Sequence, residues 1–167
     1  MSFPRTLALS ASCVLAFQAL GHAQLGASVP ETDKRAKKAL DKADLKYTVD
    51  ADGDFQVVFS YDDDRSQAVF MKSATEKVGA IEVREVFSYA YRSKDPLPTG
   101  AAVDALKDNT TRKIGAWELL EGNGKQALSF SVKIDAVTGP DALVTILRAV
   151  AQTADEREKE LLGTDEF

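Results

Sequence analysis

The residue types that most often do chemistry at neutral pH are rare in this chain of 167 residues. It contains one cysteine, Cys13, and one histidine, His22. A thiolate supplies a nucleophile or a zinc ligand, and an imidazole supplies a general base or a zinc ligand. Both residues lie within the first 23 positions, so the remaining 144 residues contain neither group.

Those first 23 residues have the pattern of a secretory signal peptide. A single arginine precedes an apolar run over residues 7–20, and Gly21 and Ala23 are the small residues that a signal peptidase reads. We therefore predict cleavage between Ala23 and Gln24, with cleavage after Gly21 or Ala27 as alternatives. Cleavage would remove the only thiol and the only imidazole from the mature protein.

Two other interpretations of this stretch are weaker. A membrane anchor needs about 20 consecutive apolar residues, and Ser10, Ser12 and Gln18 interrupt the run before that length. Lipidation at Cys13 would need an aliphatic residue three positions earlier, where Ser10 stands. We therefore expect an exported protein. Its mature chain has no cysteine for disulfides, which favours the periplasm over other oxidising compartments.

The mature chain is acidic. The leader removes one of 21 basic residues and none of 26 acidic ones, which leaves a net charge near −6. A surface of that sign repels phosphate backbones and anionic lipid headgroups, so we expect no nucleic-acid partner and no membrane partner. The length suits a single domain over residues 31–167, preceded by a short linker at 24–30.

No pattern typical of an active site follows the leader. The chain lacks Ser-x-x-Lys and Gly-x-Ser-x-Gly, and Gly122 and Gly124 close a turn that precedes no helix, so they form no phosphate loop. Serine–lysine or paired-carboxylate chemistry stays formally open. With 26 acidic residues, however, some carboxylate pair will lie at any chosen distance. We predict no catalytic residue, no metal site and no cofactor.

The acidic run Asp50, Asp52 and Asp54 superficially resembles a calcium-binding loop. An EF-hand needs glycine at loop position 6 and glutamate at position 12. Counting from Asp50, Gly53 stands at position 4 and Tyr61 at position 12. Asp-Gly between apolar alternations instead predicts a hairpin turn.

The best candidates for a partner-binding surface are four aromatic residues, Phe87, Tyr89, Tyr91 and Trp117. Tyrosine and tryptophan combine a large apolar area with a polar group, which suits interface hot spots. The competing interpretation is that these rings pack in the core between sheet and helix, because alternating aromatic residues usually face a core.

The elements that would position these residues follow from hydrophobic periodicity and turn signals. The pattern predicts helices over residues 28–45, 100–110 and 139–162, and strands over residues 46–50, 55–61, 66–72, 80–91, 114–120 and 126–134. Their order is α-β-β-β-β-α-β-β-α. Strands joined by short turns imply an antiparallel sheet, so we predict an α+β fold with the helices packed on one face.

Hydroxyl residues mark the predicted helix starts. Ser28 and Glu31 have the spacing of a capping box, Thr99 is a candidate cap for the second helix, and Thr138 for the third. The third helix should end at Gly163.

Two strands and one helix have distinctive side-chain patterns. Alternation from residue 128 to residue 134 places leucine, phenylalanine, valine and isoleucine on one face. The phase of the 80–91 strand is imperfect, which predicts a bulge near Arg84 and Glu85. The second helix should bury Ala102, Val103 and Leu106.

The same order of elements, together with four strings, resembles the YbjN family. The strings are LKYTVDADGDFQVVF, IEVREVFSYAY, KIGAWEL and AVAQTADEREKELLGTDEF, and the resemblance runs from about Ala36 to Phe167. It implies a fold like that of type III secretion chaperones and a regulatory or chaperone-like role through protein–protein contacts, with a homodimer as one option.

Composition and resemblance together favour a non-enzymatic, exported protein-binding domain of the periplasm. The export signal separates this chain from relatives that work in the cytoplasm. A periplasmic binding protein for a small molecule or an envelope polymer is the alternative, with the space between sheet and helices as its pocket. A hydrolase that uses carboxylates ranks third.

Overall fold

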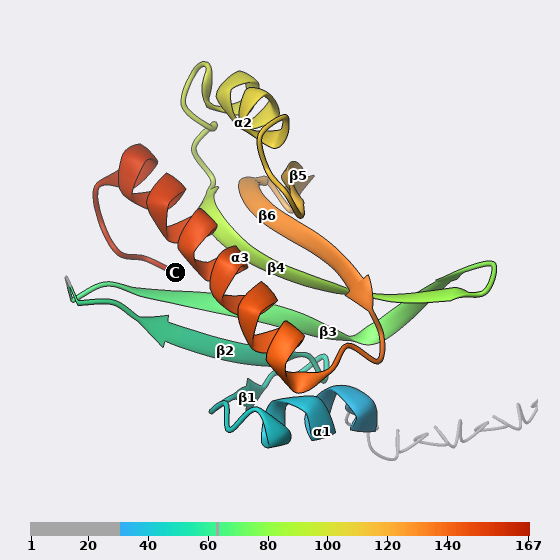
Figure 1. Ribbon diagram of the computed structural model, residues 1–167. Coiled ribbons are helices and arrows are strands. Elements are labelled where there is room, and N and C mark those ends of the chain that lie inside the picture. The colour runs from blue at the N-terminus through green and yellow to red at the C-terminus, as the bar shows by residue number, and fades with distance from the viewer. Residues whose placement is uncertain (1–30, 63) are drawn as a thin grey trace, which may run out of the picture.

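A six-stranded antiparallel sheet forms the framework of the protein in the computed structural model, which describes residues 31–62 and 64–167 (Figure 1). Three helices accompany the sheet in the predicted element order. The strand order is β1-β2-β3-β4-β6-β5. The strands are β1 (Thr48–Val49), β2 (Phe55–Ser60), β3 (Ser66–Val78), β4 (Ile81–Ser93), β5 (Ala116–Gly122) and β6 (Lys125–Asp135). The helices are α1 (Lys34–Lys42), α2 (Ala101–Asn109) and α3 (Pro140–Leu162).

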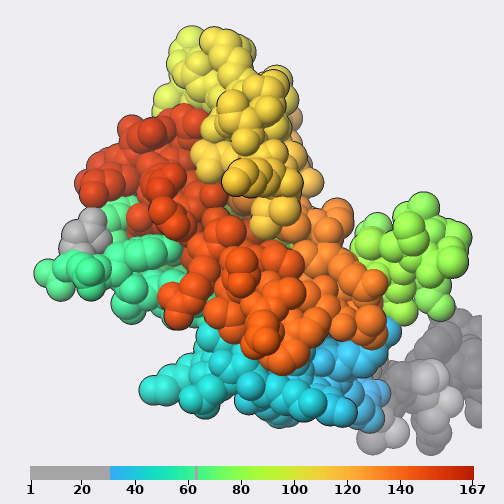
Figure 2. Space-filling view, in the orientation of Figure 1, coloured from blue at the N-terminus to red at the C-terminus, as the bar shows by residue number. Residues whose placement is uncertain are grey.

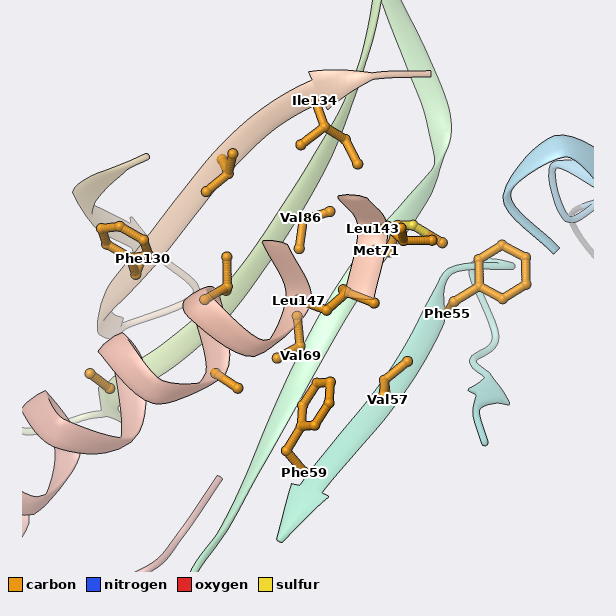
Figure 3. Close-up of a cluster of buried hydrophobic side chains, with 14 of the residues drawn as sticks. Phe55, Val57, Phe59, Val69, Met71, Val86, Phe130, Ile134, Leu143 and Leu147 are labelled. Atoms are coloured by element: carbon orange, nitrogen blue, oxygen red, sulfur yellow. The ribbon is translucent and has the colours of Figure 1, made fainter. Parts of the chain in front are cut away.

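All three helices lie on the same face of the sheet, which confirms the predicted α+β architecture. Helix α3 crosses β3, β4 and β6 diagonally, α1 packs beside the start of α3, and α2 packs on β5 (Figure 1). The alternating residues that face α3 are buried, as the periodicity predicts: Phe55, Val57 and Phe59 on β2, and Leu128, Phe130, Val132 and Ile134 on β6 (Figure 3). Each such side chain contributes about 1.5–3 kcal/mol by leaving water.

The helix starts differ from the prediction. Helix α1 begins at Lys34 rather than near Ser28, which lies outside the described residues, and Asp33 is its N-cap. The Asp33 carboxylate accepts hydrogen bonds from the backbone N–H groups of Arg35 and Ala36, at 2.7 and 3.2 Å. Asp33 is preferred because its carboxylate caps these N–H groups and also pairs with arginine side chains.

Helices α2 and α3 begin after glycine and not after the predicted threonine caps at Thr99 and Thr138. Their N-caps are Gly100 and Gly139, and neither makes a side-chain cap bond. The Thr138 hydroxyl donates instead to the carbonyl of Asp135, at 2.7 Å. The predicted end of α3 is confirmed, since Gly163 caps it in the left-handed conformation.

The buried face of α2 is also not the predicted one. Ala101 and Ala105 are buried, while Val103 and Leu106 are exposed by 54% and 65%. Small residues four positions apart let this short helix lie close to β5. The two larger apolar side chains point away from the sheet as a result.

Strands β3 and β4 form a long hairpin, and its tip stands clear of the rest of the molecule (Figures 1 and 2). We predicted that the third strand would end at residue 72, but β3 continues to Val78 and pairs there with Ile81. The tip turns through Gly79, whose φ is 61°. Both apolar residues beside the turn are exposed, by 69% and 60%.

The irregularity predicted near Arg84 and Glu85 belongs to the opposite strand. Met71 pairs with Val86 and Thr75 with Arg84, so three residues of β3 face the single residue Glu85 of β4. The bulge therefore lies on β3, and the prediction was wrong about its strand. A second shift in β4 lies between residues 89 and 91.

The predicted signal peptide, its cleavage position and the linker at 24–30 all fall outside the described residues. Among residues 31–62 and 64–167, no helix is long and apolar enough to span a membrane.

Candidate protein-binding face

Aromatic side chains cluster on the sheet face that carries no helix in the described part of the chain. Phe70 of β3 lies directly opposite Phe87 of β4 in the ladder, and their rings stack with centroids 5.3 Å apart. The Tyr89 ring lies edge-on to Phe87 at 5.4 Å and tilted to Phe70 at 6.0 Å. Strand alternation brings these residues together, since positions 87 and 89 share one face of β4. All three are half-buried.

The chain segment after α3 reaches this cluster through a gap in the sheet. The ladder between β3 and β4 ends at the pair of Phe70 and Phe87. Beyond it, the Ala68 N–H donates to the carbonyl of Phe167 at 2.8 Å. The Phe167 ring then lies 6.3 Å from Tyr89. The tail thus closes the gap and extends the aromatic cluster by one ring.

A buried arginine holds the tail in place. The Arg65 side chain donates to Asp155 at 2.7 Å, to the carbonyl of Thr164 at 2.8 Å and to Glu158 at 3.4 Å. Burial raises the pKa of the Glu158 carboxyl, although Arg65 acts in the opposite direction. The carboxylates of Asp155, Glu158 and Asp165 lie close enough to share a cation. Arg65 is the cation that they contact, so we assign the cluster to structure.

Charged side chains frame the aromatic cluster. Lys72 lies 2.5 Å from Glu85 and 5.6 Å from the centre of the Phe87 ring. Lys133 contacts the other oxygen of Glu85 at 3.2 Å. Burial alone would raise the pKa of Glu85, but hydrogen bonds from Lys72, Ser131 and Lys133 outweigh it and lower this pKa. At the opposite end, the Arg92 guanidinium lies 5.2 Å from the Tyr89 ring centre.

The cluster forms the floor of a hollow of about 390 Å³. Its wall at one end is the β1–β2 turn, which carries Asp50, Asp52 and Asp54, and at the other end β5, which supplies Glu118 and Leu120. A second hollow of about 270 Å³ continues from Tyr89 along β5 to the β5–β6 turn. The open face is therefore concave and has an aromatic floor and a mainly acidic rim.

The acidic turn is the hairpin that the Asp-Gly pattern predicts. Strands β1 and β2 pair on either side of it, and Gly53 has a φ of 83°. The Asp50 side chain accepts from the N–H groups of Asp52 and Asp54, both at 2.9 Å. These bonds stabilise the turn, as aspartate commonly does.

The four predicted partner-binding residues are divided between the two faces of the sheet. Phe87 and Tyr89 lie on the open face, whereas Tyr91 and Trp117 are buried in the core, each with 5% exposed. The register shift after Tyr89 turns Tyr91 to the helix side, where its hydroxyl donates to the carbonyl of Asp95 at 2.9 Å.

Trp117 packs under α2. Its indole N–H donates to Asp108 at 2.7 Å, and its ring meets Phe130 edge-on at 5.2 Å. Hydrogen bonds from Trp117 and Arg112 oppose the desolvation of Asp108 and lower the pKa of that carboxyl. The core-packing interpretation therefore holds for Tyr91 and Trp117, and these two side chains are not available to a partner.

Two aromatic residues of the cluster were missed by the sequence reasoning. Phe70 could have been found, because it lies within a predicted strand that precedes the aromatic strand and would pair with it. Phe167 follows a charged helix end and belongs to no periodic pattern, so no local signal indicates its place.

No family model, no curated protein and no solved structure matches this chain. The resemblance to the YbjN family therefore stays a prediction.

Proposed function

We propose that this protein is an exported, periplasmic, non-enzymatic domain that binds another protein, in a chaperone-like or regulatory role. One observation supports the proposal above others. Phe70, Phe87 and Tyr89 lie half-exposed in a concave face of the sheet, while the opposite face is covered by helices. The likeness of the sequence to the YbjN family supplies the chaperone-like part of the proposal.

The chemistry of the open face suits a protein partner. Large aromatic side chains in a concavity supply most of the binding energy in many interfaces, because a partner residue can displace water from several ring faces at once. Lys72, Glu85 and Arg92 around the rings would form the polar rim that such interfaces have. The charged rim would also select partners by the sign of the charge on their own surface.

Site-specific photo-crosslinking in the periplasm of cells that export the full chain tests this proposal. A photoreactive phenylalanine analogue replaces Phe87 in one variant and Val103 in the control, where the side chain is 54% exposed on α2. We expect a discrete protein adduct at position 87 and none at position 103. Mass spectrometry identifies the adduct, and an adduct of the protein with itself would identify a homodimer.

A second substitution tests whether the adduct at position 87 depends on the aromatic cluster. Tyr89→Ser removes a neighbouring ring without touching the crosslinker and should reduce the yield of the adduct at position 87. Val103→Ser should leave that yield unchanged. Equal adducts at both crosslinking positions, or an adduct yield at position 87 that Tyr89→Ser leaves unchanged, would contradict binding through this face.

A binding protein for a small molecule or an envelope polymer is the second candidate. The hollow of about 390 Å³ on the open face favours it, because small-molecule pockets usually measure about 300–1,000 Å³. Soluble peptidoglycan fragments added to the purified mature chain test this candidate. A rise in Tm that Tyr89→Ser abolishes and Val103→Ser retains would support it.

A further inference from the structure

Strand β5 forms one edge of the sheet and pairs only with β6. Its Trp117 N–H donates to the side chain of Asn109 at 2.7 Å and so points away from β6. In an antiparallel ladder, outward-pointing and inward-pointing residues alternate. Leu119 and Glu121 must therefore also direct their backbone N–H and C=O groups out of the sheet.

Asn109 of α2 takes the place of a neighbouring strand at Trp117. Its Oδ1 accepts from the Trp117 N–H, and its Nδ2 donates to the Trp117 carbonyl at 3.4 Å. A carboxamide offers the same donor and acceptor as a peptide group. Further along β5, no group in the described part of the chain bonds to the outward N–H and C=O groups of Leu119 or Glu121.

The free part of the edge lacks three devices that commonly block such edges, and its only charged residues are Glu118 and Glu121. Natural edge strands are commonly blocked by lysine, proline or a bulge. Residues 116–122 contain no lysine and no proline, and their pairing with β6 is regular. Leu119 and Leu120 are 45% and 43% exposed, on opposite faces of the sheet. This edge therefore offers both backbone hydrogen bonds and apolar area on either side.

We propose that the outer edge of β5 from Leu119 to Gly122 binds an extended basic segment of a partner protein, which adds to the sheet as a seventh strand. Glu118 and Glu121 flank the exposed leucines, and Glu118 also lines the hollow on the open face. These two carboxylates lie on opposite faces of the strand, so lysine or arginine side chains on either face of the added strand would lie beside one of them. The inference rests on the proposed protein-binding function and names how the partner binds.

Charge also argues against a second copy of this chain as the occupant. Each copy of the mature chain carries the same net charge, near −6, which produces a long-range repulsion between copies. A basic partner segment meets no such repulsion.

The test uses the ¹⁵N-labelled mature chain, purified after export, and a synthetic peptide in which lysine and valine alternate over seven residues. We expect the amide signals of Leu119 and Glu121 to shift on titration and their hydrogen exchange to slow. A peptide of alternating glutamate and valine should produce neither change.

Two substitutions at one position separate the backbone from the side chain. Leu119→Pro removes an N–H that bonds nothing in the described chain and should leave the β6 ladder intact, while blocking the added strand. We expect it to weaken binding about tenfold or more, whereas Leu119→Ala, which keeps the N–H, should weaken it about threefold or less. Equal affinities of the two variants would overturn the inference.

Charge reversal provides a test that does not depend on tolerance of proline. The double variant Glu118→Lys, Glu121→Lys should lose the lysine peptide and gain the glutamate peptide. Shifts confined to Phe87 and Tyr89 would overturn binding at the edge and leave the proposed function standing. Shifts at β5 without a crosslinked partner at position 87 would overturn the proposed function and leave binding at the edge standing. Changes at β5 that depend on protein concentration without peptide would make a second copy the occupant and overturn the proposal.

Discussion

Gly115, just before β5, lies in a space that only hydrogen can fill. Its φ is 75°, in the left-handed region, and an added Cβ would lie 2.7 Å from Val132 Cγ2 and 2.8 Å from the carbonyl oxygen of Ser131. Gly79, in the β3–β4 turn, has a similar φ of 61° but open space around it. A side chain at either position would be strained by the left-handed φ, and at Gly115 it would also collide with neighbouring atoms.

This difference predicts unequal effects of one substitution. Gly115→Ala and Gly79→Ala should each lose about 1–2 kcal/mol of unfolding free energy, because a left-handed φ disfavours any Cβ. Gly115→Ala should lose about 1–3 kcal/mol more, because Val132 and Ser131 must shift. Urea unfolding of both variants measures the difference. Equal losses would mean that β6 moves aside without resistance.

The candidate site shows what residue types alone can predict. Phe87 and Tyr89 could be chosen from the sequence because aromatic residues alternate along β4. Tyr91 was grouped with them for the same reason, yet the register shift after Tyr89 turns it into the core. An alternating sequence pattern cannot reveal this register shift. The extra residue of β4 is accommodated by the neighbouring strand and by buried hydrogen bonds, which the pattern does not record.

At the scale of elements, long periodic segments were predictable and short ones were not. Strand β6 and helix α3 each bury a continuous apolar stripe, so their sequences dictate both the element and its buried face. Helix α2 is only nine residues long and packs through alanines. Its face is decided by contact with β5, which no local pattern encodes.

The contacts of buried polar residues at the β3 bulge are likewise not encoded in the local sequence pattern. It leaves the carbonyl groups of Lys72 and Ser73 without strand partners, and the buried Arg84 guanidinium donates to both. The second nitrogen of Arg84 lies 2.9 Å from Asp33, the N-cap of α1. One arginine thus joins the bulge to a helix start, and neither contact is visible in the sequence around Arg84.

Helix α1 is also tied to the hairpin by an exposed ion pair, and this pair should respond to acid. Arg35 contacts Glu82 at 2.8 Å and is mainly responsible for lowering the pKa of Glu82 to about 2. Because the pKa of Glu82 is lower in the folded state than in the unfolded state, the ion pair contributes its full stabilisation above about pH 4.5. It is lost as the pH falls from about 4.5 towards about 2.

We therefore expect Glu82→Gln to reduce the loss of stability between about pH 5 and about pH 2.5, measured as the shift of the urea midpoint. Arg35→Met should reduce it further, because Arg35 also pairs with Asp33 at 2.7 Å and is the main cause of the lowered pKa of that carboxyl. The double variant should behave like Arg35→Met alone, because that substitution already removes the pair with Glu82. Additive effects of the two substitutions would show that the residues act on acid stability separately.

At the scale of the whole molecule, the tail after α3 links the two faces of the sheet. It leaves the helix side at Gly163, is held by Arg65, and ends with the Phe167 ring beside Tyr89 on the open face. The helix side is therefore a packed core, and the open face is a concave surface completed by the tail. The order of elements predicted the packed core on the helix side. Only the structure reveals the concave open face.

The remaining whole-molecule prediction concerns what reaches the periplasm. If the first 23 residues act as a signal peptide, the exported protein begins at Gln24 and contains neither Cys13 nor His22. Intact-mass measurement of protein recovered from the periplasm should give the mass of residues 24–167, and a thiol reagent should find no reactive group in the unfolded chain. Cleavage after Gly21 or Ala27 would change the mass but not the thiol result. Recovery of a chain that still carries Cys13 would contradict removal of the leader. It would also return to the protein the two side chains whose loss most strongly disfavours catalysis.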